Sequence, residues 1–274
     1  MLIYSIRKKA LIISAFFIYS LFINLFSSVQ ANTLTTDCQT RQFDQTAQVI
    51  KIYDGDTFKT DKGEKIRLIG INTPETGQQD KPSQPMANEA KQALTALLAT
   101  SKYKVGLRFG QDKHDRYKRI LAHVYLPNGT NLQEQLLAEG LAAHIVIPPN
   151  TNHLECYQRA ELSARQQHKG MWSLPAYKYK MTTSLKSADT GFQFITGDVV
   201  FIGQSKKAIW LNLTGKIALR ISKDDLHYFD KDILENIVGK KIQARGWLLY
   251  NKKRKELFMH MQHPASMKII QTTP

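Results

Sequence analysis

Three short segments of this 274-residue chain carry charged residues at spacings suited to phosphodiester chemistry. The first runs from Asp54 to Thr57, the second from Arg67 to Glu75, and the third from Asp115 to Arg119. Together they offer oxygen ligands for a hard cation, a further carboxylate and two arginines. A cation and guanidinium groups stabilise the charge that builds on a phosphate diester, and a carboxylate handles the attacking water. We therefore expect a hydrolase that acts on phosphodiester bonds.

Each segment also has an ordinary structural interpretation. Asp-Gly is a common turn dipeptide, so the first segment alone is typical of a turn. Arg67 and Arg119 fit surface ion pairs, which contribute at most about 1 kcal/mol each. Glu75 follows Pro74 and fits a solvated loop acid. The occurrence of all three segments in this order favours the catalytic interpretation.

The apolar pattern of the first half predicts a small barrel. Five strands are expected, at residues 48–53, 57–60, 65–71, 103–109 and 119–126. Helices are expected at residues 86–100, 132–139 and 153–168, the last two stopped by Gly140 and Gly170. Five short strands with a helix after the third indicate a closed barrel of the OB type.

The second half repeats this pattern after a polar, Lys- and Ser-rich segment at residues 175–190, which we predict to be a linker. Strands are expected at residues 192–202, 208–213, 216–221, 241–250 and 257–261, with a helix from Ser222 to Val238. The predicted fold is thus α+β and mainly β, with an OB-fold barrel and three helices in domain 32–174. A second small OB-like barrel is expected in domain 191–274.

The first 31 residues are predicted to be a signal peptide. A basic start, Arg7 to Lys9, precedes an apolar run at residues 10–26, and Val29-Gln30-Ala31 fits a cleavage site. The competing interpretation is an uncleaved membrane anchor, since the run approaches the length that spans a bilayer. Under both interpretations the rest of the chain is exported. We expect a periplasmic or secreted protein with no membrane contact after cleavage.

The chain is strongly basic. Its formal net charge is +15, and loss of the three cations in residues 1–31, which contain no acids, leaves +12. Such a charge favours a polyanionic partner, and nucleic acid agrees with the phosphate chemistry. The cluster Lys252 to Lys255 fits either a solvated hairpin end or a surface that follows a phosphate backbone.

Two cysteines, Cys38 and Cys156, are present. In an exported chain an even count permits a disulfide, which would tie the N-terminal tail to a late helix. The alternative is two unpaired thiols. The histidines show no metal-ligand spacing, and none is placed to serve a serine or cysteine nucleophile.

Five motifs link residues 32–173 to a known family. They are Asp-Gly-Asp-Thr at 54–57, Arg-Leu-x-Gly-x-x-Thr-Pro-Glu at 67–75, Asp-x-Tyr-x-Arg at 115–119, Leu-x-x-x-Gly-Leu-Ala at 136–142 and Trp-Ser at 172–173. This part of the chain resembles the staphylococcal nuclease (thermonuclease) family. The resemblance implies an OB-fold enzyme that cleaves DNA and RNA with Ca²⁺ and leaves 3′-phosphates.

The resemblance also implies a ligand set. Asp56 would bind Ca²⁺, Thr73 would bind it through its backbone carbonyl, and Asp54 would lie just outside the direct ligands. Asn72 stands where the best-known member has an aspartate. Its amide oxygen is a legitimate ligand without a negative charge, so weaker metal binding is expected.

The remaining roles follow in the same way. Arg67 and Arg119 would grip the scissile phosphate, and Glu75 would activate or order the water. Tyr117 and Lys118 would contact the substrate. A second departure is the segment from His144 to Ile147, which occupies the place of two family tyrosines and removes their stacking surface.

The sequence therefore predicts an exported Ca²⁺-dependent nuclease that acts as a monomer on DNA or RNA, with no small-molecule cofactor. The alternative is a nuclease-fold module of little or no activity that binds nucleic acid or protein. A third class, a structural protein of the envelope, depends on the second domain alone.

Overall fold

The computed structural model describes residues 38–77 and 82–270. The predicted signal peptide at residues 1–31, and its alternative as an anchor, lie outside these residues. Among the helices that are described, none has the length and apolar character to span a bilayer.

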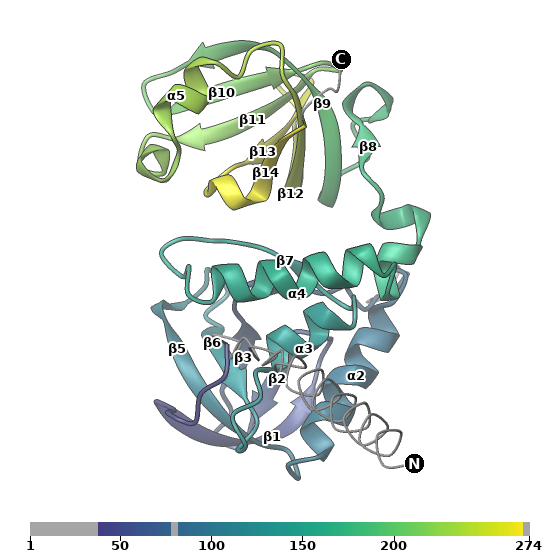
Figure 1. Ribbon diagram of the computed structural model, residues 1–274, viewed down its shortest axis with the longest axis vertical. Helices are drawn as coiled ribbons and strands as arrows, with labels where there is room; N and C mark the ends of the chain where they lie inside the picture. The colour runs from purple at the N-terminus through teal and green to yellow at the C-terminus, as the bar shows by residue number, and fades with distance from the viewer. Residues whose placement is uncertain (1–37, 78–81, 271–274) are drawn as a thin grey trace, which may run out of the picture. The chain divides into compact units, whose positions relative to one another are not determined.

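Five strands close into a barrel in the first half of the chain (Figure 1). They are β1 (Gln45–Ile52), β2 (Thr57–Thr60), β3 (Lys65–Leu68), β5 (Lys104–His114) and β6 (Ile120–Tyr125). The order around the barrel is β1-β2-β3-β6-β5. The β3–β6 pair is parallel, and the other four pairs are antiparallel. This arrangement confirms the predicted OB-type barrel.

Among residues 38–77 and 82–174, three helices pack around this barrel: α2 (Ala87–Ala99), α3 (Leu132–Ala138) and α4 (Leu154–Gln166). In α2 the fully buried residues Ala90, Leu94 and Leu98 recur every four positions, so one face of the helix enters the core. A short pair, β4 (Ile71–Asn72) with β7 (Ala143–His144), lies beside the barrel. The three predicted helices are thus present, each within two residues of its expected ends.

A disulfide joins Cys38 to Cys156 in α4, with Cα atoms 6.1 Å apart. Both residues are buried in the core of the first barrel. The bridge closes a loop across 118 residues of sequence. It therefore fixes the segment before β1 to the last helix of the domain.

A second barrel follows. Its strands are β9 (Gly191–Gln204), β10 (Ala208–Leu213), β11 (Ile217–Ser222), β12 (Lys241–Asn251) and β13 (Glu256–His260). The order β9-β10-β11-β13-β12 is closed by pairing of β12 with β9, and β11 runs parallel to β13. β8 (Lys180–Met181) and β14 (Met267–Ile270) extend the sheet at its edges. The second OB-like barrel is therefore confirmed.

The stretch from Ser222 to Val238 is less helical than predicted. It contains a 3₁₀ turn, η4 (Leu226–Tyr228), and a five-residue helix, α5 (Lys231–Glu235). Ser222 does not cap a long helix. Its hydroxyl donates to the Asp225 carboxylate and accepts from the Asp225 backbone N–H, which closes a turn. The cap is Asp230, whose side chain accepts the backbone N–H of Ile233.

Two other segments differ from the secondary structure that the sequence predicts. β5 continues to His114, beyond the expected end at Phe109. Its last four residues are exposed and carry no apolar alternation, so the sequence pattern does not predict this extension. The predicted linker at residues 175–190 contains the 3₁₀ turns η2 (Pro175–Tyr177) and η3 (Thr182–Ser184), with β8 between them. β8 pairs with β9, which places this connection against the second barrel.

The two barrels lie in one compact unit and share a buried contact. Arg245 of β12 forms an ion pair with Glu161 of α4 at 2.5 Å, and both side chains are at most 9% exposed. Beside it the rings of Trp172 and Phe194 pack at 5.4 Å. The Arg165 guanidinium lies 4.2 Å from the Trp172 ring centre. These contacts hold the beginning of β9 beside the first barrel.

Candidate active site

The Asp-Gly-Asp-Thr segment forms the turn between β1 and β2 and begins β2 at Thr57. The Asp56 backbone N–H donates to Asp54 Oδ1 at 3.0 Å, which fixes the turn. Gly55 is required there, because an added Cβ would lie 2.7 Å from Ala90 Cβ and 2.9 Å from Thr73 Cγ2. The turn therefore presses against α2 and places two carboxylates at the end of the barrel.

The Asp56 carboxylate is buried and has polar partners at both of its oxygens. Its Oδ1 accepts from Thr57 Oγ1 at 2.9 Å and pairs with Arg67 Nε at 3.1 Å. Its Oδ2 accepts from the backbone N–H and the hydroxyl of Thr73 at 2.9 and 3.0 Å. Since Asp56 is only 3% exposed, these bonds replace the water that it loses on burial.

Arg67 on β3 is oriented by four acceptors. Besides Asp56, its Nη1 donates to the carbonyls of Leu68 and Ile71 at 2.6 and 2.9 Å. Its Nη2 donates to Asn72 Oδ1 at 3.3 Å. The guanidinium thus joins two of the predicted metal ligands, Asp56 and Asn72. Because Arg67 and Asp56 are both buried, their ion pair is not the surface pair that the alternative interpretation expects.

Arg119 approaches from the turn between β5 and β6. Asp115 accepts from Arg119 Nε and Nη2, both at 2.7 Å, and from its backbone N–H. Arg119 Nη1 reaches Thr57 Oγ1 at 3.5 Å, and this hydroxyl in turn donates to Asp56. Tyr117 is 64% exposed, and its ring centre lies 5.5 Å from the Arg119 guanidinium. Lys118 is exposed in the same turn.

Glu75 lies after β4, where reciprocal bonds with Gln84 hold its backbone. The Glu75 N–H donates to Gln84 Oε1 at 2.9 Å, and the Gln84 N–H donates to the Glu75 carbonyl at 3.0 Å. The carboxylate is therefore anchored by its main chain while its side chain retains solvent contact.

The acids of the site repel one another. Burial, followed by the Asp56 carboxylate, raises the pKa of Asp54 to about 7. Partial burial, followed again by Asp56, raises the pKa of Glu75, although Arg67 and Arg119 oppose this rise. Glu75 keeps exposed surface, so solvent screening limits the effect. Asp54, Asp56 and Glu75 thus share one field with the two arginines.

This donor set fits a hard cation. The four carboxylates of Asp54, Asp56, Glu75 and Asp115 outnumber the two arginines, so negative charge is in excess. Asn72 adds an amide oxygen beside them at 6% exposure. Carboxylate and amide oxygens are the ligands that Ca²⁺ prefers. The neighbouring Thr73 is held by Asp56 at both its N–H and its hydroxyl.

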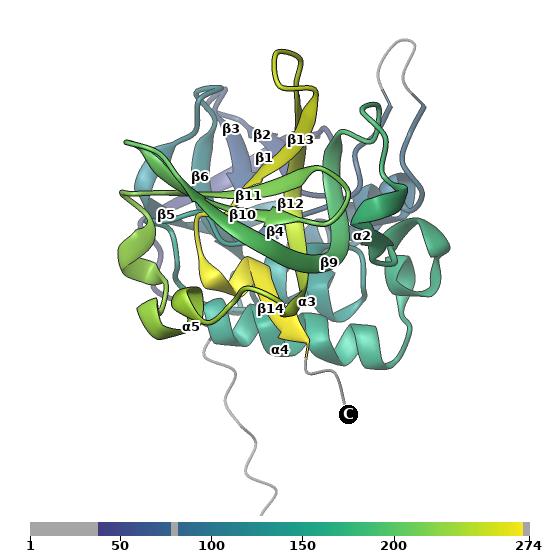
Figure 2. The same cartoon turned by 90° about the horizontal axis from the view of Figure 1, so that it is seen from above.

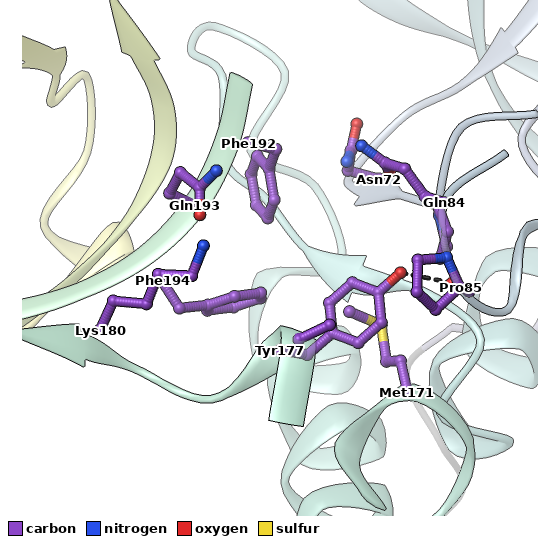
Figure 3. Close-up of a pocket in the computed structure, with 11 residues that line it drawn as sticks. Asn72, Gln84, Pro85, Met171, Tyr177, Lys180, Phe192, Gln193 and Phe194 are labelled. Carbon is purple, nitrogen blue, oxygen red and sulfur yellow. Dashed lines mark hydrogen bonds between the residues drawn. The ribbon is translucent and has the colours of Figure 1, made fainter. Parts of the chain in front are cut away.

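A cavity of about 130 Å³ opens beside Asn72 (Figure 3). Asn72, Pro74 and Gln84 line it from the first barrel, and Phe192 and Phe194 line it from β9. Tyr177 of η2 projects into the same space and donates its hydroxyl to the Pro85 carbonyl. The second barrel therefore supplies aromatic walls to a cavity that reaches the candidate site.

Sequence reasoning missed three groups at this site. Thr57 links Asp56 to Arg119, Gln84 fixes the backbone of Glu75, and Phe192 enters from the second barrel. The Asp-Gly-Asp-Thr motif contains Thr57 but does not indicate that its hydroxyl links Asp56 to Arg119. No periodicity signals either group, because Gln84 lies outside any helix or strand and Phe192 meets the site only through packing of the second barrel.

His144 does not replace the family tyrosines at the surface. It is buried, with 1% exposure, and burial lowers its pKa to about 3, with Arg245 adding to the effect. Its backbone N–H donates to Glu161 at 3.3 Å. His144 therefore belongs to the contact between the barrels, while Ile147 at 43% exposure stays at the surface.

An OB barrel that gathers three carboxylates and two arginines at one end has the composition of a phosphodiester-cleaving site. Comparison with known proteins agrees with this class. The family model described as Staphylococcal nuclease homologue matches residues 65–174. The thermonuclease of Staphylococcus hyicus is 37% identical over 133 residues, which cover 47% of this chain and 77% of the relative. The chain belongs to the staphylococcal nuclease family.

Two further relatives have similar identities. The thermonuclease of Staphylococcus intermedius is 32% identical over 127 residues, covering 45% of this chain and 74% of the relative. The SPbeta prophage-derived endonuclease YokF of Bacillus subtilis is 33% identical over 150 residues, covering 50% of each chain. None of these three matches extends over more than half of the present chain.

Proposed function

We propose that this protein is an exported, Ca²⁺-dependent nuclease that hydrolyses phosphodiester bonds of DNA, RNA or both as a monomer. The observation that carries the proposal is the shared field of Asp54, Asp56, Glu75, Arg67 and Arg119 at one end of the first barrel. The names of the relatives, thermonuclease and endonuclease, support the same activity.

Asp56, Asn72 and Thr73 would hold the Ca²⁺, with Asp54 beside them. When bound, Ca²⁺ would neutralise negative charge on the phosphate and orient the phosphate for attack by water. The deficit of positive charge among the carboxylates supports this assignment. The uncharged Asn72 lowers the affinity but leaves an oxygen donor in place.

Glu75 would accept a proton from the attacking water. The raised pKa of Glu75 makes its carboxylate a stronger base, which suits a group that must take up a proton during the reaction. The water oxygen forms the new bond to phosphorus, the bond to the 5′ oxygen breaks, and the 5′ oxygen is protonated from solvent. The phosphate stays on the 3′ end, as the family resemblance implies.

Arg67 and Arg119 would donate to the phosphate oxygens as negative charge builds on them. A planar guanidinium fits a phosphate with two parallel hydrogen bonds. Arg119 already lies beside Thr57 and Asp56, and Tyr117 and Lys118 stand at the exposed rim where the strand would approach. The net positive charge favours encounter with a polyanion.

Export is supported by the N-terminal pattern and by the Cys38–Cys156 disulfide, since such bridges persist in oxidising compartments. We place the protein in the periplasm or outside the cell. A cleaved signal peptide leaves residues 32–274 as the acting form.

The test is incubation of residues 32–274 with plasmid DNA and with RNA, in Ca²⁺ or in chelator. Cleavage in Ca²⁺ that chelator abolishes supports the proposal. A folded sample that binds nucleic acid without cutting it, across millimolar Ca²⁺ and mildly alkaline pH, would support the alternative of a binding module that Asn72 has weakened as an enzyme.

A further inference from the structure

The outer surface of the second barrel carries adjacent aromatic rings. Trp210 lies on β10 and Phe258 on β13, and their ring centres are 6.2 Å apart. Their strand neighbours Leu211 and Leu257 point into the core, so the two rings point outward. Phe201 of β9, 57% exposed, lies on the same surface beside Gly203, the partner of Trp210 in the sheet.

Cations flank these rings. Arg220, the sheet partner of Trp210 on β11, has its guanidinium 5.8 Å from the Trp210 ring centre. Arg254 approaches the same ring at 5.6 Å from the β12–β13 turn. We call Trp210, Phe258, Arg220 and Arg254 the aromatic face. Further lysines occupy the bounding turns, namely Lys206 and Lys207 between β9 and β10, and Lys252, Lys253 and Lys255 between β12 and β13.

The position of this face within the barrel is informative. OB folds bind oligonucleotides on their second and third strands, between the loop that joins strands one and two and the loop that joins strands four and five. Here those strands are β10 and β11, and the loops are the two lysine-rich turns. The second turn projects beyond the barrel (Figure 2). Residues 191–270 contain 14 basic and 7 acidic side chains, a formal charge of +7.

We propose that the aromatic face binds single-stranded nucleic acid. Bases would stack on Trp210 and Phe258, while Arg220 and Arg254 would meet the phosphates. Rings at this spacing beside guanidinium groups serve unpaired bases, because a duplex hides the faces of its bases from a protein surface. The proposed binding site lies in the second barrel, outside residues 65–174 that match the family model.

The aromatic face continues towards the cavity beside Asn72. Leu249 of β12, 42% exposed, pairs with Phe258 across the sheet. Trp247 lies two residues along β12 on the same outer side, 40% exposed, and its ring centre is 5.1 Å from that of Phe192. Phe192 lines the cavity (Figure 3). This apolar path would guide the strand to the catalytic end of the first barrel, a step that rests on the proposed nuclease function.

Binding is tested in chelator, so that the result does not depend on cleavage. The probes are a labelled oligothymidine strand and a duplex of the same length, measured by fluorescence anisotropy with residues 32–274. We expect Trp210→Ala to weaken strand binding at least about tenfold. Trp210→Phe, which keeps a stacking ring, should retain most of the affinity. Leu162→Ala removes an exposed apolar side chain from α4 and is the matched control.

Strand affinity that is unchanged in Trp210→Ala would overturn the proposal. Equal losses for strand and duplex would overturn it as well, since they would indicate attraction by charge alone. The path to the active site has its own test. Trp210→Ala should raise KM for a long single strand at unchanged kcat and leave cleavage of a dinucleotide unaltered. If the wild type cuts nothing, the proposed nuclease function fails, while the result in chelator still decides the binding site.

Discussion

At the scale of single residues, the two arginines of the site are held differently. Arg67 is buried, and its guanidinium contacts Asp56, two backbone carbonyls and Asn72. Arg119 is half-buried and is held by Asp115 with its Nη1 directed to Thr57. Arg67 therefore orients Asp56 and Asn72, two of the proposed metal ligands, whereas Arg119 is the more exposed of the two arginines.

Arg119→Lys is the cleaner test of the phosphate contact. Lysine keeps the charge but loses the planar fork, so kcat should fall at least about 100-fold while the melting temperature changes little. The matched control is Arg159→Lys, because Arg159 also pairs with an acid four residues away, Glu155, but on the outside of α4. A rate in Arg119→Lys above half that of the wild type would remove Arg119 from the mechanism.

Asn72→Asp should tighten Ca²⁺ binding. The change adds a carboxylate beside Arg67 and Asp56. Repulsion from Asp56 offsets part of the added attraction for Ca²⁺, so we expect a gain on the order of 1 kcal/mol. Activity titrated against Ca²⁺ gives the midpoint, and Asn128→Asp in an exposed turn is the control. An unchanged or weaker midpoint would mean that residue 72 is not a ligand.

At the scale of elements, the sequence predicted the strands whose apolar residues alternate. β10 and the core-facing half of β5 follow that alternation, and α2 shows its four-residue spacing. The exposed end of β5 and the break in the stretch from Ser222 to Val238 were missed. In both cases local side-chain bonds or solvent exposure decide the backbone, and neither leaves a periodic signal.

The candidate site shows the same division. The motifs identified the acids and arginines, because they lie close to one another along three short segments. They did not indicate that Phe192 and Tyr177 would stand beside Asn72, since this proximity follows from packing of the second barrel. The bridging by Thr57 also needed the structure, because it joins the turns of two different hairpins.

Gly55→Ala tests whether the turn between β1 and β2 is positioned by its contact with α2. The new methyl would lie 2.7 Å from Ala90 Cβ, so the turn must shift and carry Asp54 and Asp56 with it. We expect at least about a tenfold loss of kcat and a loss of stability of roughly 1–3 kcal/mol. The double change with Ala90→Gly relieves the closest contact and should recover part of the rate. Full activity in the single variant would contradict this account of the turn.

At the scale of the whole molecule, a buried ion pair links the barrels. Glu161 of α4 and Arg245 of β12 are desolvated together, and the Glu161 carboxylate also accepts the His144 N–H. Because the cavity beside Asn72 has walls from both barrels, this contact bears on the shape of the site. A buried pair is best judged by breaking it from one side and then from both.

Arg245→Met should lower the free energy of unfolding by about 3 kcal/mol, because it leaves a buried carboxylate without its partner. The double variant Arg245→Met with Glu161→Gln removes the charge and should recover most of that loss. Denaturant unfolding followed by Trp fluorescence measures both. A single variant as stable as the double would show that Glu161 reaches water when Arg245 is absent, and that the barrels separate readily.

We propose that the carboxylates at the end of the first barrel catalyse cleavage of phosphodiester bonds, and Glu75→Gln tests this role most directly. The measurement is the rate of single-turnover DNA cleavage in saturating Ca²⁺, with the exposed Glu139→Gln as the matched control. We expect the rate to fall at least about 100-fold in Glu75→Gln, with the fold and DNA binding retained, and to stay unchanged in the control. A Glu75→Gln rate within about twofold of the wild type would contradict it, because such a loss is far below what removal of a general base causes.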